Sequence, residues 1–181
     1  GGSTFSDNVT DAEFTHGGKG MFVGSSIRSQ VNFADVTSFP ARWKTVYTSA
    51  GSGCYGLGHD KARGRLYTLT DAGNGQRDLV ALDVQDPNSP NFGKVLGNSV
   101  KFAGGAYVER WALSPSGNLA AVLSGVLGPT NVILVDTDPT SKTYLSVVQT
   151  LSVPLGAGLA LCNRIRFTAD ESQILVLIQI A

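Results

Sequence analysis

The chain has 181 residues, of which 42% are hydrophobic, so it can bury the core of one domain or slightly more. Fourteen basic residues balance fourteen acidic ones, and this neutrality gives no electrostatic basis for binding nucleic acid or an anionic membrane. Only 15% of the residues are charged and 22 are glycine, which is typical of a turn-rich all-β protein.

Four segments along the chain read as β-hairpins, each with a strand, a tight polar turn and a second strand. They are residues 12–26, 57–71, 111–125 and 165–179. Their turns contain Gly17-Gly18, Gly64, Pro115 with Gly117, and Asp170-Glu171, which suit hairpin turns. The flanking Phe, Leu, Tyr, Val and Ile favour strands, and Gly, Pro or β-branched residues interrupt every candidate for a long helix.

A third strand follows each of the first three hairpins and ends on an aspartate. The segments are VNFADVTSFP (31–40), LVALDVQDPN (79–88) and VILVDTDPTS (132–141). Asp35, Asp83 and Asp136 are therefore separated by 48 and 53 residues. A period near 50 indicates a propeller or another repeat array.

A fourth strand after each aspartate turn completes a four-stranded meander, the unit of a propeller blade. These strands are predicted at WKTVYTSA (43–50), GKVLGNSVKFA (93–103) and LSVVQTLSV (145–153). The blades are then about residues 5–50, 51–105 and 106–155, followed by a half-blade at 156–181. We expect an incomplete β-propeller of about three and a half blades, about half of a seven-bladed ring.

The repeats resemble those of known β-propeller proteins. LSPSGNLAAVLSG, with the strands that follow it, looks like a blade of the YVTN-type and WD40-like bacterial propellers. DLVALDVQDPNSPNFGKVLG is similar to the LVIVP-type repeat of bacterial and archaeal surface propellers. The resemblance implies a blade and not one activity, because these groups include binding scaffolds, surface proteins, lactonases and haem-carrying enzymes.

The last predicted strand, Ile174–Ile180, would occupy an open sheet edge. Seven or eight apolar residues are too few to span a bilayer, which takes roughly 20 in a helix. An unpaired strand needs a partner. Further blades of the same protein could supply it, two or more chains could pool their blades, or the segment GGSTFSDNVT of a neighbour could add a strand.

Few residues are candidates for a binding site. The repeat places Asp11, Arg110 and Arg164 at comparable positions near the start of the inner strands, with Leu57 or Gly58 in the second blade. Two guanidiniums at the mouth of a propeller channel could hold a carboxylate or phosphate. Ion pairs or backbone contacts between blades are the favoured alternative for these side chains.

Other polar motifs have simpler interpretations. Asp35, Asp83 and Asp136 could line a calcium site, but their recurrence in every blade favours hydrogen bonding to their own turns. DAGNGQRD (71–78) lacks the EF-hand spacing and reads as a plain loop. His16 and His59 are expected to be solvated turn residues, and we expect no metal and no cofactor.

Two motifs invite a cofactor or a disulfide. GSGCYG (51–56) matches the dinucleotide-binding glycine pattern, but a strand follows it where a helix is required. Cys54 and Cys162 should lie on inner strands of blades that are not neighbours, beyond disulfide reach. Both are therefore expected to be small, buried, free residues.

These observations leave two hypotheses about function. The first is a non-enzymatic β-propeller module for protein binding or assembly, extracellular or periplasmic, completed by further blades or another chain at Ile174–Ile180. The second is part of a propeller enzyme, lactonase-like or haem-dependent, whose catalytic residues are largely outside this segment. No G-x-S-x-G pattern or convergent Ser/His/Asp set favours the second.

Overall fold

A computed structural model describes residues 9–51, 53–71, 77–102, 108, 110–124, 130–154 and 160–180, without the side chains of 160–163 and 178–180. This part of the chain consists of strands, turns and one 3₁₀ turn, η1 (His16–Gly18). The strands are β1 (Val9–Phe14), β2 (Gly20–Ser25), β3 (Gln30–Asp35), β4 (Arg42–Thr48), β5 (Cys54–Asp60), β6 (Arg65–Asp71), β7 (Arg77–Asp83), β8 (Val100–Phe102), β9 (Trp111–Leu113), β10 (Leu119–Ser124), β11 (Asn131–Asp136), β12 (Ser146–Ser152), β13 (Ala160–Phe167) and β14 (Ile174–Ile180). Within these ranges, no helix has the length and apolar character needed to cross a membrane.

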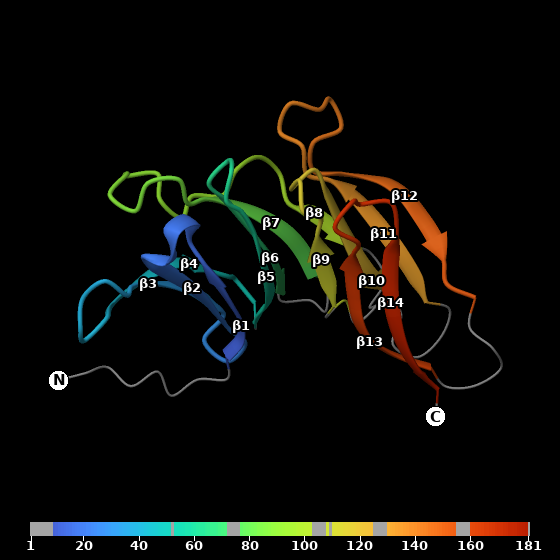
Figure 1. Ribbon diagram of the computed structural model, residues 1–181, viewed down its shortest axis with the longest axis horizontal. Coiled ribbons are helices and arrows are strands. Elements are labelled where there is room, and N and C mark those ends of the chain that lie inside the picture. The colour runs from blue at the N-terminus through green and yellow to red at the C-terminus, as the bar shows by residue number, and fades with distance from the viewer. Residues whose placement is uncertain are drawn as a thin grey trace. The chain divides into compact units, whose positions relative to one another are not determined.

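The strands form four separate sheets, of which three are four-stranded meanders and the fourth is a two-stranded hairpin among the described residues (Figure 1). The first sheet has the order β1-β2-β3-β4, the second β5-β6-β7-β8 and the third β9-β10-β11-β12, while β13 pairs with β14. The predicted all-β class and the final strand at Ile174–Ile180 are confirmed. The chain forms two compact units, Gly1–Gly97 and Asn98–Ala181, which are described separately.

The outer strand of the second sheet is shorter than predicted. The sequence predicts a continuous strand over residues 93–103, whereas β8 spans only Val100–Phe102 and Val95 forms an isolated bridge with Leu82. Gly93 and Gly97 have φ angles of 86° and 69°. These left-handed conformations are incompatible with extended strand geometry, so they divide the segment.

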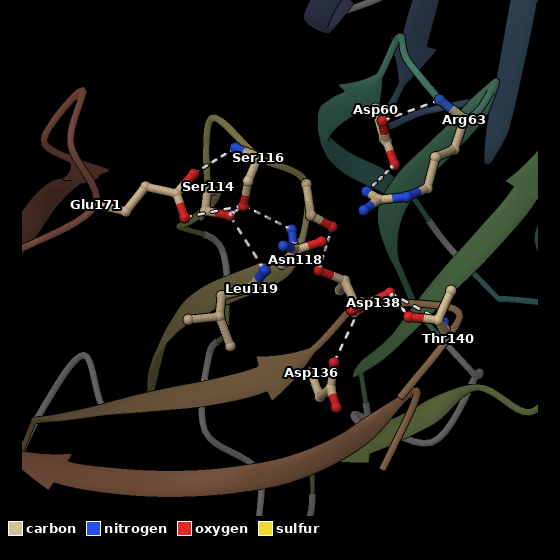
Figure 2. A network of polar contacts seen from close by, with 12 residues as sticks. Asp60, Arg63, Ser114, Ser116, Asn118, Leu119, Asp136, Asp138, Thr140 and Glu171 are labelled. Atoms are coloured by element: carbon tan, nitrogen blue, oxygen red, sulfur yellow. Dashed lines mark hydrogen bonds and ion pairs between the residues drawn. The ribbon is translucent and has the colours of Figure 1, made fainter. Parts of the chain in front are cut away.

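The hairpin turns are closed by side-chain hydrogen bonds. In the first, third and fourth sheets a hydroxyl residue follows the first strand, namely Thr15, Ser114 and Thr168. Its hydroxyl oxygen accepts the backbone N–H of the residue five positions later at 2.9–3.1 Å. In the second sheet the last residue of the first strand, Asp60, accepts the N–H of Arg63 and forms a 2.9 Å ion pair with its guanidinium (Figure 2). A polar residue at the end of the strand thus closes each turn locally.

Glu171 joins the hairpins of the third and fourth sheets. It occupies the position that Gly18 and Gly117 hold in their hairpins, and its φ of 59° is in the left-handed region. Its carboxylate accepts the backbone N–H and the hydroxyl of Ser116, the latter at 2.9 Å (Figure 2). These charge-assisted bonds offset a backbone cost of about 1 kcal/mol.

Each unit has a core between two neighbouring sheets. In the first unit β5 contacts β1 and β2, and the buried cluster is Phe22, Val31, Cys54, Leu57, Leu66, Val80, Leu82, Val84 and Phe92. In the second unit β13 contacts β9 and β10, and the buried cluster is Ala121, Leu123, Val132, Leu134 and Ile165. Apolar residues on facing strands thus account for the sheet-to-sheet packing.

Candidate functional site

The predicted site residues Asp11, Arg110 and Arg164 occupy equivalent positions in their sheets. Each lies three residues before the last residue of its hairpin's first strand, which is Phe14 on β1, and Asp11 and Arg164 each follow a β-bulge. The same count in the second sheet gives Leu57, which also follows a bulge. A bulge inserts one extra residue, so it sets which side chain of each inner strand takes this position.

The structure places the three side chains differently. Asp11 Oδ2 accepts the N–H of Leu57 on the neighbouring inner strand at 3.0 Å, so it joins the first two sheets. Arg110 and Arg164 belong to the second unit, where β9 and β13 contact each other, and both are exposed. Anion binding by this pair stays a prediction.

The repeated aspartates accept hydrogen bonds within their own turns. The Oδ1 atoms of Asp35, Asp83 and Asp136 accept the backbone N–H two residues later at 2.9, 3.1 and 2.9 Å. Hydrogen bonds from Thr37 hold the pKa of Asp35 below its ordinary value. Within the described residues, no group of three His, Cys, Asp or Glu side chains converges to hold a metal ion.

The first unit contains a cleft of about 560 Å³ between its two sheets. The β1–β2 turn, strands β2 to β4, the end of β5 and the β5–β6 turn line it, together with the loop that follows β7. The cationic lining residues are Lys19, Arg42, Lys44 and Lys61, and the aromatic ones are Phe22, Phe33, Trp43 and Phe92. Its size and aromatic lining are those of a binding pocket.

The floor of the cleft is a cluster of aromatic rings. The Phe22 and Phe33 centroids are 5.3 Å apart, and Phe33 meets the Phe92 ring edge to face at 5.4 Å. Phe92 follows the polar stretch DPNSPN, and its side chain is 9% exposed. This site was not predicted from the sequence, although a single aromatic residue in a polar loop is a signal that could have identified Phe92 as an anchor.

Lys44 connects the two walls of the cleft. It lies on β4, and its ammonium group is 5.0 Å from the Phe92 ring centroid, within cation–π range. The same group donates to the carbonyl oxygen of Pro87 at 3.4 Å. The position of the Lys44 ammonium group is therefore set by contacts with the loop that follows β7 of the second sheet.

The prediction that His59 is a solvated turn residue is wrong, whereas His16 is exposed on the turn as expected. His59 lies on β5, and its ring meets Phe22 edge to face at a centroid distance of 5.3 Å. Its Nδ1 is 3.3 Å from the Phe14 carbonyl oxygen. Because β5 extends to Asp60, His59 is a strand residue and not a turn residue, and it lines the cleft.

Acidification below about pH 6.5 is expected to destabilise the first unit through His59. Burial lowers the pKa of His59 below its ordinary value of 6.5, partly opposed by the Phe14 hydrogen bond. The unfolded state therefore binds more protons in this window, so stability is present above pH 6.5 and is lost as the pH falls. Urea unfolding between pH 7.5 and 5.5 measures this slope.

The matched variant for this measurement is His59→Gln. In this variant the free energy of unfolding should no longer decline between pH 7.5 and 5.5. It should still decrease at more acidic pH, where Asp35 becomes protonated. An unchanged slope in His59→Gln would contradict the assignment.

Cys54 is a free, fully buried thiol, and burial raises its pKa to about 12. The Cys162 side chain and residues 72–76 of DAGNGQRD lie outside the described residues. The segment after GSGCYG is the strand β5, so the helix required for dinucleotide binding is replaced by a strand.

Solved structures with the same architecture identify the fold. The chain matches the Myceliophteria thermophila Cps50 (Swd1) β-propeller domain with a TM-score of 0.63 and 11% identity, over 96% of this chain and 53% of that one. The fold is a β-propeller. The match to Kuenenia stuttgartiensis hydrazine synthase has a TM-score of 0.69 and 12% identity, over 96% and 43% of the two chains. The match to a structure of a nidogen/laminin complex has a TM-score of 0.66 and 11% identity, over 95% of this chain and 57% of that one.

The comparisons establish the architecture of this β-propeller chain alone. Scans against family models and curated proteins found no match. The chain spans about half the length of the solved structures, and identities of 11–12% carry no activity across. The four-stranded sheets correspond to blades, and the β13-β14 sheet has two described strands.

Proposed function

We propose that this chain is a non-enzymatic β-propeller module for protein binding or assembly, and that its last sheet is completed by strands from further blades or from another chain. The proposal rests on strand β14, which pairs with β13 alone among the described strands. In the other sheets, the second strand pairs with a third, namely β3, β7 or β11. Strand addition at such an edge is a recognised mode of protein binding.

The face of β14 supports the same proposal. Ile174 and Val176 pack against the third sheet, whereas Leu175 and Leu177 are 58% and 61% exposed. On β10, the second strand of the third sheet, residues 120–123 are buried on both faces. A partner would therefore cover one face of β14 as well as its edge.

The origin and location of the module are part of the proposal. The motifs LSPSGNLAAVLSG and DLVALDVQDPNSPNFGKVLG support repeats of the YVTN and LVIVP types. Low charge and abundant glycine support a place at the cell surface or in the periplasm. A module in either location would present its blades to other proteins outside the cytoplasm.

A labelled peptide copying residues 130–153 of this chain tests strand addition. It contains the third and fourth strands of a complete sheet, β11 and β12. Fluorescence anisotropy should detect its binding, and changing Leu134 of the peptide to proline should weaken binding at least tenfold, because proline removes a ladder N–H.

Protein variants complete the test. Leu175→Lys with Leu177→Lys should weaken peptide binding at least tenfold, because the lysines place charge on the apolar face. Ile27→Lys is the matched control, since Ile27 is also exposed, at 64%, but lies in the first sheet's turn. Equal loss in the control, or no binding by the unmodified chain, would contradict the proposal.

A further inference from the structure

We propose that the cleft of the first unit binds a short acidic segment of a partner protein, with one aromatic side chain inserted between the two sheets. This site is on other strands than β14, so it goes beyond the proposed completion of the last sheet. Three features of the cleft support such a ligand, namely its aromatic floor, its charge and the rigidity of its walls.

The floor fits an aromatic side chain. Phe33 contacts both Phe22 and Phe92 at centroid distances of 5.3 and 5.4 Å, and Trp43 lines the same cleft. Aromatic rings in edge-to-face contact gain about 0.5–1.5 kcal/mol beyond area burial. An inserted ring would extend a cluster whose geometry already exists.

The charge of the lining selects an acidic ligand. Lys19, Arg42, Lys44 and Lys61 line the cleft, and Asp35 is the one carboxylate among the described lining residues. The chain as a whole is neutral, so this local excess of positive charge is a property of the cleft. Complementary charge steers an acidic ligand and fixes its orientation.

The distribution of the cations favours a linear ligand over a small anion. Lys19 lies beside the β1–β2 turn, Lys61 follows β5, and Arg42 and Lys44 lie on β4. A single carboxylate can contact only a subset of groups on separate segments. A peptide with acidic residues on both sides of its aromatic anchor can contact both walls.

The walls of the cleft are held in place without a ligand. A Cβ atom at Gly20 would lie 2.4 Å from the Phe33 ring, so the absence of a side chain there lets the ring settle onto β2. The contacts of Lys44 with Phe92 and Pro87 fix the opposite side. Such preorganisation reduces the entropic cost of binding.

Tryptophan fluorescence can measure this binding directly. The chain has two tryptophans, Trp43 in the cleft and Trp111 in the second unit, so Trp111→Phe leaves Trp43 as the reporter. The probe is a capped pentapeptide with a central phenylalanine and two acidic residues on each side. We expect saturable quenching of Trp43 fluorescence. The affinity obtained from it should fall at least tenfold when the salt concentration rises from about 50 to 500 mM, because salt screens exposed charges.

Two further peptides and a small molecule test the chemistry of recognition. Replacing the central phenylalanine of the peptide with serine, or its acidic residues with lysines, should each weaken binding at least tenfold, as an order-of-magnitude expectation. Equal binding of the serine peptide would overturn the aromatic anchor. If N-acetylphenylalanine bound as tightly as the acidic peptide, the ligand would be a small molecule and not a protein segment.

Charge reversal in the chain tests the location. The double variant Lys19→Glu with Lys61→Glu should weaken binding of the acidic peptide at least tenfold. Lys142→Glu changes an exposed residue of the second unit and should alter this binding by less than about twofold. The Leu175→Lys and Leu177→Lys variant should bind this peptide normally, which separates the site from the β14 edge. No saturable binding, or equal loss in Lys142→Glu, would overturn the proposal.

Discussion

Replacing Gly93 with alanine is expected to lower the free energy of unfolding of the first unit by about 3 kcal/mol or more. Gly93 has a φ of 86°, which strains any L-residue. A Cβ atom there would lie 2.1 Å from the carbonyl oxygen of Val46 and 2.7 Å from its Cγ1. The nearest clashing atom is backbone of β4, so relief requires the loop to move away from the first sheet.

Urea unfolding followed by Trp43 fluorescence in the Trp111→Phe background measures this loss. Gly17→Ala is the control, because Gly17 also has a positive φ, 78°, but no atom lies within 4 Å of the position that an added methyl group would take. The control should lose only about 1 kcal/mol, the cost of the backbone conformation. Similar losses at both positions would show that the contact with Val46 is unimportant.

Replacing Phe22 with alanine is expected to lower the free energy of unfolding by about 3–5 kcal/mol. The Phe22 side chain is fully buried, and its ring contacts Phe33, His59 and Phe92 at centroid distances of 5.3, 5.3 and 6.2 Å. Truncation leaves a cavity between two sheets whose strands cannot close it without losing their own pairing.

The same urea titration tests this second prediction. Phe14→Ala removes an equal number of atoms from a side chain that is 52% exposed, and should cost less than half as much. Phe22→Leu retains most of the apolar volume and should restore more than half of the loss. A small effect of Phe22→Ala would mean that the sheets of the first unit do not depend on the aromatic cluster.

Much of the local architecture can be predicted because its causes are close in sequence. The hairpin turns follow from glycine or short polar residues between alternating strands, and Gly117 adopts the positive φ that its turn needs. The aspartates at strand ends bond to the N–H two residues later, which requires no distant partner. The boundary of β8 is harder to predict because two glycines interrupt an apparently continuous apolar pattern.

The candidate site cannot be predicted in the same way. Phe22, Lys44 and Phe92 are separated by 22 and 48 residues, and no periodic pattern relates them. The polar neighbours of His59 in the sequence favour a solvated turn, whereas Phe22 and Phe14 contact it from the first sheet. Its lowered pKa therefore depends on packing between sheets.

The repeating meander of this propeller chain is specified by the amino-acid sequence alone, because strand alternation and turn chemistry act over a few residues. Which side chains share a cleft depends instead on the tertiary structure. Packing the second sheet on the first gathers aromatic rings and cations from separate strands and turns, and the distances between these segments are set by the backbone of both sheets together.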